Sequence, residues 1–285
     1  MSATVDPAST LRLVAAYAAP VGGGTGAGIH ENEPVTPASV MKIQIALAAA
    51  DLLDGGEQRV LRPDRRTPGP VGISLMRDEV RMSVRDLTTL MLTISDNVAA
   101  DELLGLLGVD RVNGFTARLG LAGTRITSDL GTMLDDTARE AGFADFHAMS
   151  LSSGDPRHRL DTTAAFDPAR GPRTTAAETV RLLQAIWRDE AASPRACAEV
   201  RRGMSAQLTR HRIAAGFGPE VRVAAKSGGL LGLVRNEAGV VTYPDGERYA
   251  VAVFTRANPA DPTDPATIDT AIAHTARKLV DACRP

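Results

Sequence analysis

The chain has 285 residues, of which 44% are hydrophobic and 23% are charged, and its formal net charge is -2 at pH 7. A chain of this length and ordinary globular composition can bury a large core, and its charge gives no general attraction to nucleic acid or to an acidic membrane surface. No apolar run approaches the ~18 residues of a membrane-spanning helix, so the sequence predicts none.

The first twenty residues lack the basic segment and the long apolar core of a secretory signal. We therefore expect a cytoplasmic protein, or a secreted one if a leader has been removed. The two cysteines, Cys197 and Cys283, show no CxxC spacing, and the five histidines are scattered along the chain. These patterns predict neither a disulfide framework nor a metal site, and they indicate no cofactor.

The N-terminal part of the chain predicts two strands followed by a helix. Residues 11–17 and a stretch near Ile29 have the composition of strands, and they flank a glycine-rich turn over 22–28. The helix is predicted to begin at Ser39, because apolar residues recur at helical spacing over 40–53 and two glycines follow.

Further helices are predicted through the middle of the chain. A loop rich in Pro, Arg and Gly over 62–72 precedes Ser83, which we expect to cap a second helix. A Ser-Asp-Asn triplet at 95–97 interrupts this helix, and two more helices are predicted over 99–107 and 110–119.

The segment 131–173 is polar and contains several Gly, Pro, Ser and Asp residues, so it predicts the longest stretch without regular structure. After it, Thr175 and Glu178 have the spacing of a capping box, in which each side chain bonds the other residue's backbone N–H. These two residues predict the start of another helix.

The C-terminal third of the chain changes in character. Residues 221–225, 238–243 and 248–255 are predicted strands, and a Pro-Asp-Gly turn at 244–246 joins the last two into a hairpin. A closing helix is predicted over 268–280.

The predicted order is thus strands, many helices, strands and a final helix. The simplest architecture is an α+β fold in which an antiparallel sheet from both chain ends is flanked by helices, with an all-α domain inserted between them. We place the discontinuous sheet domain at residues 1–38 and 200–285 and the inserted helical domain at residues 39–199.

Ser39 and Lys42 form an S-x-x-K motif at the start of a predicted helix. Residues three apart share one helix face, so the lysine amine is within reach of the serine hydroxyl, and the helix N-terminus offers N–H groups to a developing negative charge. The motif is weak by itself, because about one match is expected by chance in a chain of this length. Ser39 alone is equally well explained as a helix cap.

Two more short motifs occur further along, an S-D-N triplet at 95–97 and a K-S-G triplet at 226–228, which ends a predicted strand. The chain has only three lysines, Lys42, Lys226 and Lys278, on an arginine-rich background, and two of them fall in these motifs. A buried lysine can lose its proton and act as a base, whereas an arginine cannot.

The ordered set S-x-x-K, S-D-N, K-S-G resembles that of the serine β-lactamase and penicillin-binding protein superfamily, and class A is the most similar group. The resemblance extends over most of residues 29–255, including an Arg-Ile pair at 212–213 and Arg-Asn-Glu at 235–237. It implies a β-lactamase/DD-peptidase-like fold.

The resemblance also implies catalytic roles. Ser39 would be the nucleophile that attacks an acyl carbonyl, and Lys42 would be its base. Ser95 would relay a proton to the leaving nitrogen, and Asn97 would hold the substrate amide. The backbone N–H groups of Ser39 and Gly229 would form the oxyanion hole.

Substrate binding is implied for the last motif. Lys226, Ser227 and Gly228 would bind the substrate, and its carboxylate would be attracted by the first two of them with help from Arg235. Asp96, in the S-D-N triplet, is expected to be a structural cap rather than a catalyst.

One element of class A is missing. In those enzymes a glutamate activates the water that removes the acyl group, and counting forward from Asn97 its counterpart here is Leu130. Asp129 and Asp135 lie nearby without the corresponding sequence context, and an extra stretch of chain follows before Thr175. Efficient deacylation is therefore in doubt, while the residues for acylation are present.

These features predict a β-lactamase-like serine hydrolase that acts on an amide or ester carbonyl, with β-lactam hydrolysis through an acyl-Ser39 intermediate as the leading activity. We expect a monomer whose partner is a small acyl compound, not nucleic acid or a membrane. Two alternatives stay open: an intracellular esterase, amidase or transacylase with slow deacylation, and a β-lactam-binding sensor without turnover. A DD-peptidase is disfavoured, because a cytoplasmic enzyme does not meet cross-linked peptidoglycan.

Overall fold

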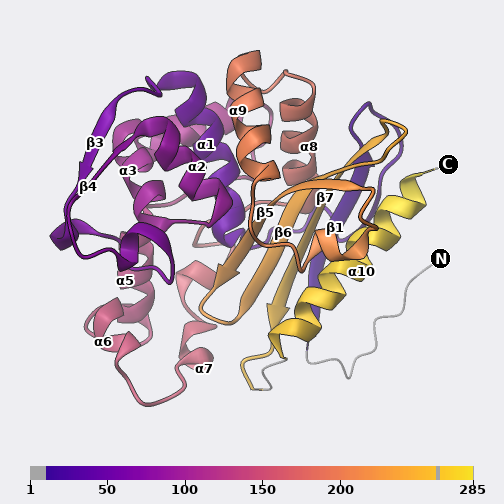
Figure 1. The fold of residues 1–285 in the computed structure, drawn as a ribbon. Helices are drawn as coiled ribbons and strands as arrows, with labels where there is room; N and C mark the ends of the chain where they lie inside the picture. The colour runs from indigo at the N-terminus through magenta and orange to yellow at the C-terminus, as the bar shows by residue number, and fades with distance from the viewer. Residues whose placement is uncertain (1–10, 261–263, 285) are drawn as a thin grey trace.

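The computed structural model describes residues 11–260 and 264–284. Its centre is a five-stranded antiparallel sheet in the order β2-β1-β7-β6-β5, which combines strands from the two ends of the chain (Figure 1). The predicted α+β fold is thus confirmed. The strands of the sheet are β1 (Leu11–Pro20), β2 (Ala27–Ile29), β5 (Arg222–Leu230), β6 (Val234–Thr242) and β7 (Arg248–Ala257).

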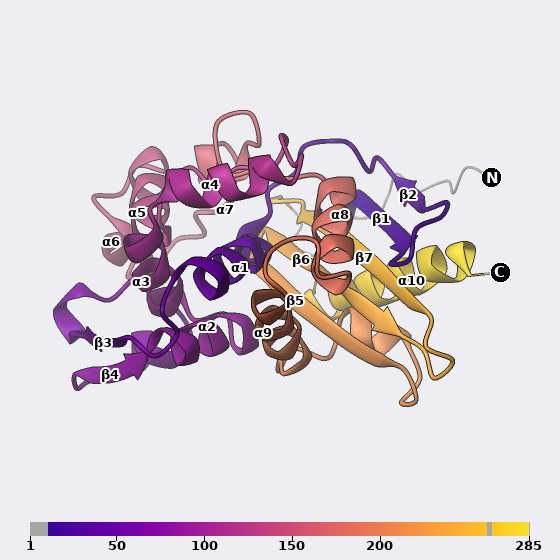
Figure 2. The same cartoon turned by 90° about the horizontal axis from the view of Figure 1, so that it is seen from above.

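Helices cover both faces of the sheet (Figure 2). On one face lie α10 (Pro265–Cys283) and the 3₁₀ turn η5 (Ile213–Gly216). On the other lie α8 (Ala176–Trp187), α9 (Pro194–Ser205) and α1 (Lys42–Leu52).

Strand β7 shows why both faces need this cover. Its side chains alternate between the faces, as the pleat of a strand requires. Val251 and Val253 belong to the apolar cluster under α10, whereas Ala250, Ala252 and Phe254 belong to the cluster on the α8 side. Both clusters are buried, so the central strand has no polar face.

The middle of the chain forms a helical region beside the sheet, with a short hairpin at its outer edge (Figure 1). Ser83 caps the first of these helices by accepting a hydrogen bond from Asp86 N at 3.1 Å, as predicted. The elements are β3 (Gln58–Leu61), β4 (Val80–Ser83), α2 (Val84–Thr93), α3 (Asn97–Leu107) and α4 (Val109–Arg118). The division into two domains at residues 38 and 200 stays a prediction, and residues 1–10 of its first segment lie outside the described residues.

The prediction that residues 131–173 lack regular structure is wrong. They contain short helices around an apolar cluster that includes Leu134, Ala138, Met149, Leu160 and Phe166. The helical period was hard to recognise because each helix is short and the Gly, Pro and Asp residues between them dominate the composition. The elements are α5 (Leu130–Glu140), α6 (Phe146–Ser150), α7 (Arg157–Leu160) and the 3₁₀ turn η4 (Ala164–Phe166).

Strands β3 and β4 and helix α9 were not predicted from the sequence. Of the predicted capping box, only the bond to Thr175 is present. Thr175 caps α8 by accepting from Glu178 N at 3.0 Å. The Glu178 carboxylate, however, accepts from Gly123 N at 2.9 Å and from Thr124 Oγ1 at 2.6 Å. Glu178 therefore ties α8 to the loop that follows α4 instead of completing the box.

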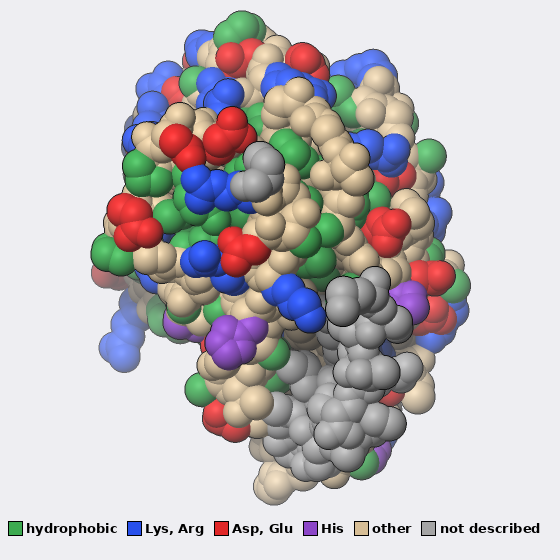
Figure 3. All heavy atoms as spheres, turned by 90° about the vertical axis from the view of Figure 1, so that its right-hand side faces the viewer, with side chains coloured by type: hydrophobic (Ala, Val, Ile, Leu, Met, Phe, Trp, Pro, Cys, Tyr) green, Lys and Arg blue, Asp and Glu red, His purple; other side chains and the backbone are tan. Residues whose placement is uncertain are grey.

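No helix in the described part of the chain is long and apolar enough to cross a bilayer. Figure 3 shows the side of the molecule on which α10 lies, and there Lys and Arg side chains are interspersed with Asp and Glu. On the described part of this face, basic and acidic side chains are therefore mixed, unlike the clustered basic surface that is typical of nucleic-acid binding.

Candidate active site

Ser39 lies in a 3₁₀ turn, η1 (Ala38–Met41), which leads from the sheet into α1, and it lines a cavity of about 570 Å³. The preceding Ala38 has a φ of 48°, a left-handed conformation that costs a non-glycine residue ~1–3 kcal/mol and therefore needs support. Asn236 of β6, which is fully buried, provides it: Nδ2 donates to Thr36 O at 2.9 Å and to Pro37 O at 3.2 Å. The sheet thus fixes the backbone just before Ser39.

Replacing Asn236 with leucine should lower the free energy of unfolding by roughly 3 kcal/mol. Leucine has a similar size but removes the bonds to Thr36 and Pro37, and it leaves the Thr255 N–H, which now donates to Asn236 Oδ1 at 3.0 Å, without its acceptor. The same replacement at exposed Asn258 should change stability by less than about 1 kcal/mol. Urea unfolding of the two variants measures the difference, and equal losses would contradict the support assigned to Asn236.

Lys42 begins α1 and is fully buried. Its Nζ donates to Ser95 O at 2.6 Å and to Asn97 Oδ1 at 2.7 Å, and it lies 3.4 Å from Ser95 Oγ. Burial lowers the pKa of Lys42 to about 7, although the negative charges of Asp101 and Asp96 oppose the shift. Near neutral pH this amine is therefore partly unprotonated, which is the state that accepts a proton.

The S-D-N triplet joins α2 to α3 and holds the partners of Lys42 in place. Asp96 is fully buried and caps α3, as expected, and its Oδ2 also accepts from Ile73 N at 2.7 Å. Asn97 donates from Nδ2 to Pro68 O at 2.9 Å. Ser95 has a φ of 65°, a second strained residue of the kind that clusters at functional sites.

The K-S-G triplet lies on β5, the edge strand of the sheet. Lys226 is fully buried, and its Nζ donates to Ser227 O at 2.7 Å. Burial lowers the pKa of Lys226 well below its usual range, and the charge of Lys42 lowers it further, so a proton on one lysine disfavours a proton on the other. Gly228 must be glycine, because a Cβ atom there would lie 2.9 Å from Pro37 O.

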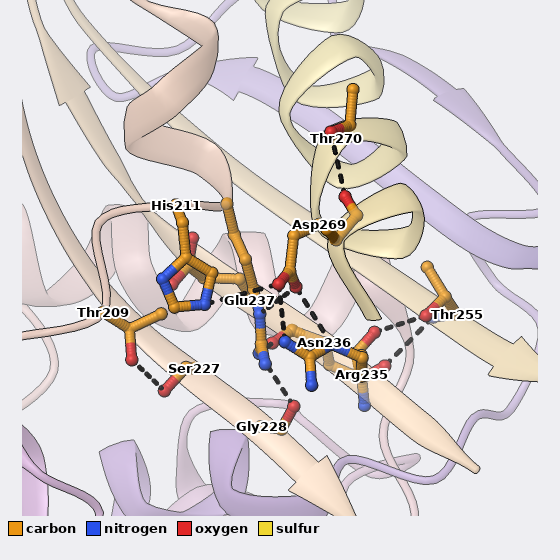
Figure 4. A network of polar contacts seen from close by, with 12 residues as sticks. Thr209, His211, Ser227, Gly228, Arg235, Asn236, Glu237, Thr255, Asp269 and Thr270 are labelled. Carbon is orange, nitrogen blue, oxygen red and sulfur yellow. Dashed lines mark hydrogen bonds and ion pairs between the residues drawn. The ribbon is translucent and has the colours of Figure 1, made fainter. Parts of the chain in front are cut away.

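A glutamine from the loop after α9 binds the same triplet. Gln207 accepts from the Ser227 N–H and donates to Glu237 Oε1 at 3.0 Å. The Ser227 hydroxyl donates to Thr209 Oγ1 at 3.4 Å (Figure 4). Burial raises the pKa of Glu237, whose Oε2 accepts from Ile213 N at 2.6 Å. The backbone of the triplet is therefore anchored along its outer edge.

Arg235 of β6 lines the cavity and is held by a carboxylate of α10. Its Nε and Nη2 donate to the two oxygens of Asp269 at 3.0 and 2.6 Å (Figure 4). Arg212 binds the same carboxylate at 2.8 Å and reaches Gly228 O at 3.0 Å and Asn236 O at 2.7 Å. Two guanidinium groups thus share the carboxylate of Asp269, and the carboxylate of Glu237 also acts on Arg212.

Leu130, the first residue of α5, forms part of the cavity wall. Asp101 anchors this helix start by accepting from Leu130 N at 2.7 Å and from Gly131 N at 2.9 Å, and burial raises the pKa of its carboxyl group. The nearby carboxylates of Asp129 and Asp135 each accept from a backbone N–H of the same segment. Among the described residues that line the cavity there is no Asp or Glu.

The structure brings most of the predicted site residues to one place. Four of them line the cavity, and two lysines lie buried in the adjoining elements, while Ser95 contacts the first lysine and Ser227 lies toward Thr209. The four that line the cavity are Ser39, Asn97, Gly229 and Arg235. Their roles in catalysis and binding stay predictions. No cluster of His, Cys, Asp or Glu within residues 11–260 and 264–284 is arranged to hold a metal ion.

Three residues that build the site were given no role from the sequence: Asp101, Gln207 and Asp269. Each binds a partner far away along the chain, such as Asp269 with Arg235 or Gln207 with Ser227. No local spacing pattern marks such a residue, because its function depends on how distant elements pack.

Residues 9–283 match the model of a family described as Beta-lactamase enzyme family. The chain is 32% identical over 279 residues to a protein of Streptomyces cacaoi named beta-lactamase regulatory protein BlaB, and the alignment covers 90% of this chain and 88% of that protein. Among solved structures it is similar to a β-lactamase from Sphaerobacter thermophilus, with a TM-score of 0.74, 24% identity and coverage of 94% of this chain and 90% of that one. It is also similar to a mutant of PBP-A in an acyl-enzyme complex with penicillin G, with a TM-score of 0.74, 20% identity and coverage of 96% and 92%.

Proposed function

Since the chain belongs to the beta-lactamase enzyme family, we propose that it is a serine hydrolase whose Ser39 is acylated by the carbonyl group of a β-lactam or a related ester or amide. The observation that supports this most is the state of Lys42: a fully buried amine with a pKa of about 7, bonded to the S-D-N loop and one helical turn from a serine that lines a cavity. Burying an amine without a function for it is costly, because burial disfavours the charged form.

In the proposed reaction, Ser39 Oγ attacks the carbonyl carbon and its proton passes to the neutral amine of Lys42. Ser39 and Gly229 line the same cavity, and in this proposal their N–H groups stabilise the negative charge on the carbonyl oxygen. The bond between carbonyl carbon and lactam nitrogen breaks, and Ser95, 3.4 Å from Lys42 Nζ, relays the proton to that nitrogen. The product of this step is an ester on Ser39.

The guanidinium group of Arg235, which lines the cavity, supports binding of a substrate carboxylate at the β5 end of the cavity. Arg235 keeps its guanidinium plane fixed by the two bonds to Asp269, so little conformational entropy is lost when an anion binds to its free edge. Ser227 and Lys226 lie on the neighbouring strand in register with Glu237 and Ala238 of β6. We propose that they bind the same carboxylate by hydrogen bonds, since burial disfavours the charged form of Lys226.

The cavity wall favours a second candidate function, a β-lactam-responsive regulator that keeps its acyl group. Leu130 stands where an enzyme with fast deacylation would have a glutamate, and the described lining contains no other carboxylate. The relative from Streptomyces cacaoi is named as a regulatory protein. Transfer of the acyl group to another nucleophile, as in a transacylase, has the same structural basis.

Intact-mass spectrometry after exposure to penicillin G tests the proposal. Ring opening loses no atoms, so the wild-type protein should gain the full mass of the penicillin, and Ser39→Ala should gain none. Ser205→Ala, at an exposed serine of α9, is the matched control and should be labelled like the wild type. A label that persists in Ser39→Ala would overturn the assignment of the nucleophile.

A further inference from the structure

The lining of the cavity that contains Ser39 is largely apolar. Ser39, Asn97 and Arg235 are the only lining residues with polar side chains among those described. The rest of the lining is glycine, proline, alanine and large hydrophobic side chains. The large ones include Leu130, Met133, Phe146, Leu230, Leu231 and Val234.

Two separate parts of the chain form the apolar wall. Helices α5 and α6 provide one side, and the turn between β5 and β6 provides the other. Leu134 of α5 belongs to the same buried cluster as Leu230, the last residue of β5, and Val234, the first residue of β6. The two sides are therefore packed against each other. The apolar cavity is therefore a preformed feature of the fold.

Polar contacts fix this wall from behind. Asp101 binds the backbone at the start of α5, and Arg256 of β7 donates to Asp161, just after α7, at 2.9 Å. Arg256 also donates to the carbonyl oxygen of Phe166. The inserted helices are thus attached to the central strand of the sheet and are not an independent flap.

Leu231, in the turn between β5 and β6, has a φ of 43°, and Gly232 follows with a φ of 76°. Asn, Asp or Gly adopts a left-handed conformation more easily than leucine, for which it is strained. Backbone preference therefore does not account for a leucine at this position. Its apolar side chain accounts for it, because Leu231 packs against the cluster of α5 to α7 and also lines the cavity.

We propose that this apolar wall forms an acyl pocket, and that the natural substrate of Ser39 is an ester, amide or lactam whose acyl group carries a bulky apolar chain. The inference rests on the proposed acylation of Ser39 and adds the substrate class. A polar acyl chain would lose its hydrogen bonds to water there without replacement, whereas an apolar chain is stabilised by each methylene that it buries. The volume of about 570 Å³ is that of a small-molecule site.

The test uses p-nitrophenyl acetate, butyrate, hexanoate and octanoate. Ser39 Oγ forms the new ester bond, the bond to the phenolic oxygen breaks, the serine proton passes to Lys42, and p-nitrophenolate leaves and is observed as a burst. The second-order rate constant of acylation should rise about fourfold for each added methylene until the pocket is filled. A rate constant that is the same for acetate and hexanoate would overturn the acyl pocket.

Variants distinguish binding of the acyl chain in this pocket from an effect of the greater hydrophobicity of the longer esters. Leu231→Asn suits the left-handed backbone, and Met133→Gln keeps the size of a half-buried side chain, so both should fold and both should flatten the chain-length series. Leu151→Asn, at a leucine that is 71% exposed and outside the cavity, is the matched control and should leave the series steep. A steep series in all three variants would overturn the acyl pocket alone, whereas no Ser39-dependent burst with any ester would overturn the proposed function itself.

Discussion

Replacing Lys42 with arginine should slow acylation of Ser39 by ~10²–10⁴-fold, nearly as much as replacing it with methionine. Arginine keeps the positive charge but cannot lose its proton, so it cannot take the proton from Ser39. The bonds of Lys42 Nζ to Ser95 and Asn97 show that the amine is already placed beside the proposed relay. Stopped-flow measurement of acylation by penicillin G gives the rate. Lys278→Arg, at an exposed position of α10, is the control for the same substitution and should have no effect.

The pH dependence of acylation follows from the same residue. Burial lowers the pKa of Lys42 from 10.5 to about 7. The fraction of neutral amine therefore falls tenfold for each pH unit below about 7, and above about pH 8 nearly all of the amine is neutral. The acylation rate of the wild type should therefore rise through pH 7 and then level off. A rate that is constant from pH 5 to pH 9, or an active Lys42→Arg variant, would show that another group is the base.

Turnover of penicillin G should be limited by deacylation. A burst of about one equivalent of ring-opened product should precede a slow steady state, since acylation depends on the oxyanion donors and on Lys42, not on a carboxylate in the wall. Introducing the missing base with Leu130→Glu should accelerate the steady state, by up to ~10²–10⁴-fold if the carboxylate is well placed to activate a water molecule. An added amine or alcohol should also speed release of the acyl group from the wild type.

The control for this experiment is Leu130→Gln, which has the shape of the glutamate without its basicity. Leu130→Gln should change the packing of the cavity wall as much as Leu130→Glu does, but it should leave the steady-state rate within a few fold of the wild type. Equal acceleration by glutamine and glutamate would mean that access of water, not a base, limits the wild type. Fast wild-type turnover without a burst would show that Asp129, Asp135 or the neutral amine of Lys42 already serves as the base, and the regulatory candidate would lose its main support.

The position of each of the three motifs on its element was predictable from the sequence because it depends on local spacing. Ser39 and Lys42 are three residues apart, the S-D-N triplet interrupts a helix, and the K-S-G triplet ends a stretch of strand-forming residues. The strands at the two chain ends and several of the helices also followed from local patterns. These signals place each motif on its element without knowledge of the packing.

What could not be predicted depends on contacts between distant segments. The wall of α5 to α7 is composed of short helices whose apolar residues form a recognisable cluster only when they pack against Leu230 and Val234. The pairing of Arg235 with Asp269 likewise needs α10 to lie across the sheet. Glu178 had the spacing of a capping residue, yet its carboxylate binds Gly123 and Thr124, which are close only in the folded chain.

The pairing of β1 with β7 has a consequence for how the molecule forms. The register runs from Leu11 opposite Ala257 to Pro20 opposite Tyr249. Strand β1 therefore cannot pair with β7 until more than 200 later residues have been synthesised. Such long-range pairing makes folding slow, because the entropy of closing the long loop is lost before the contacts between the two strands can offset it. During synthesis the S-x-x-K and S-D-N segments leave the ribosome well before β5 and β6. The backbone before Ser39 therefore acquires its support from Asn236 only after β6 has been made, and a shorter growing chain carries Ser39 without that support.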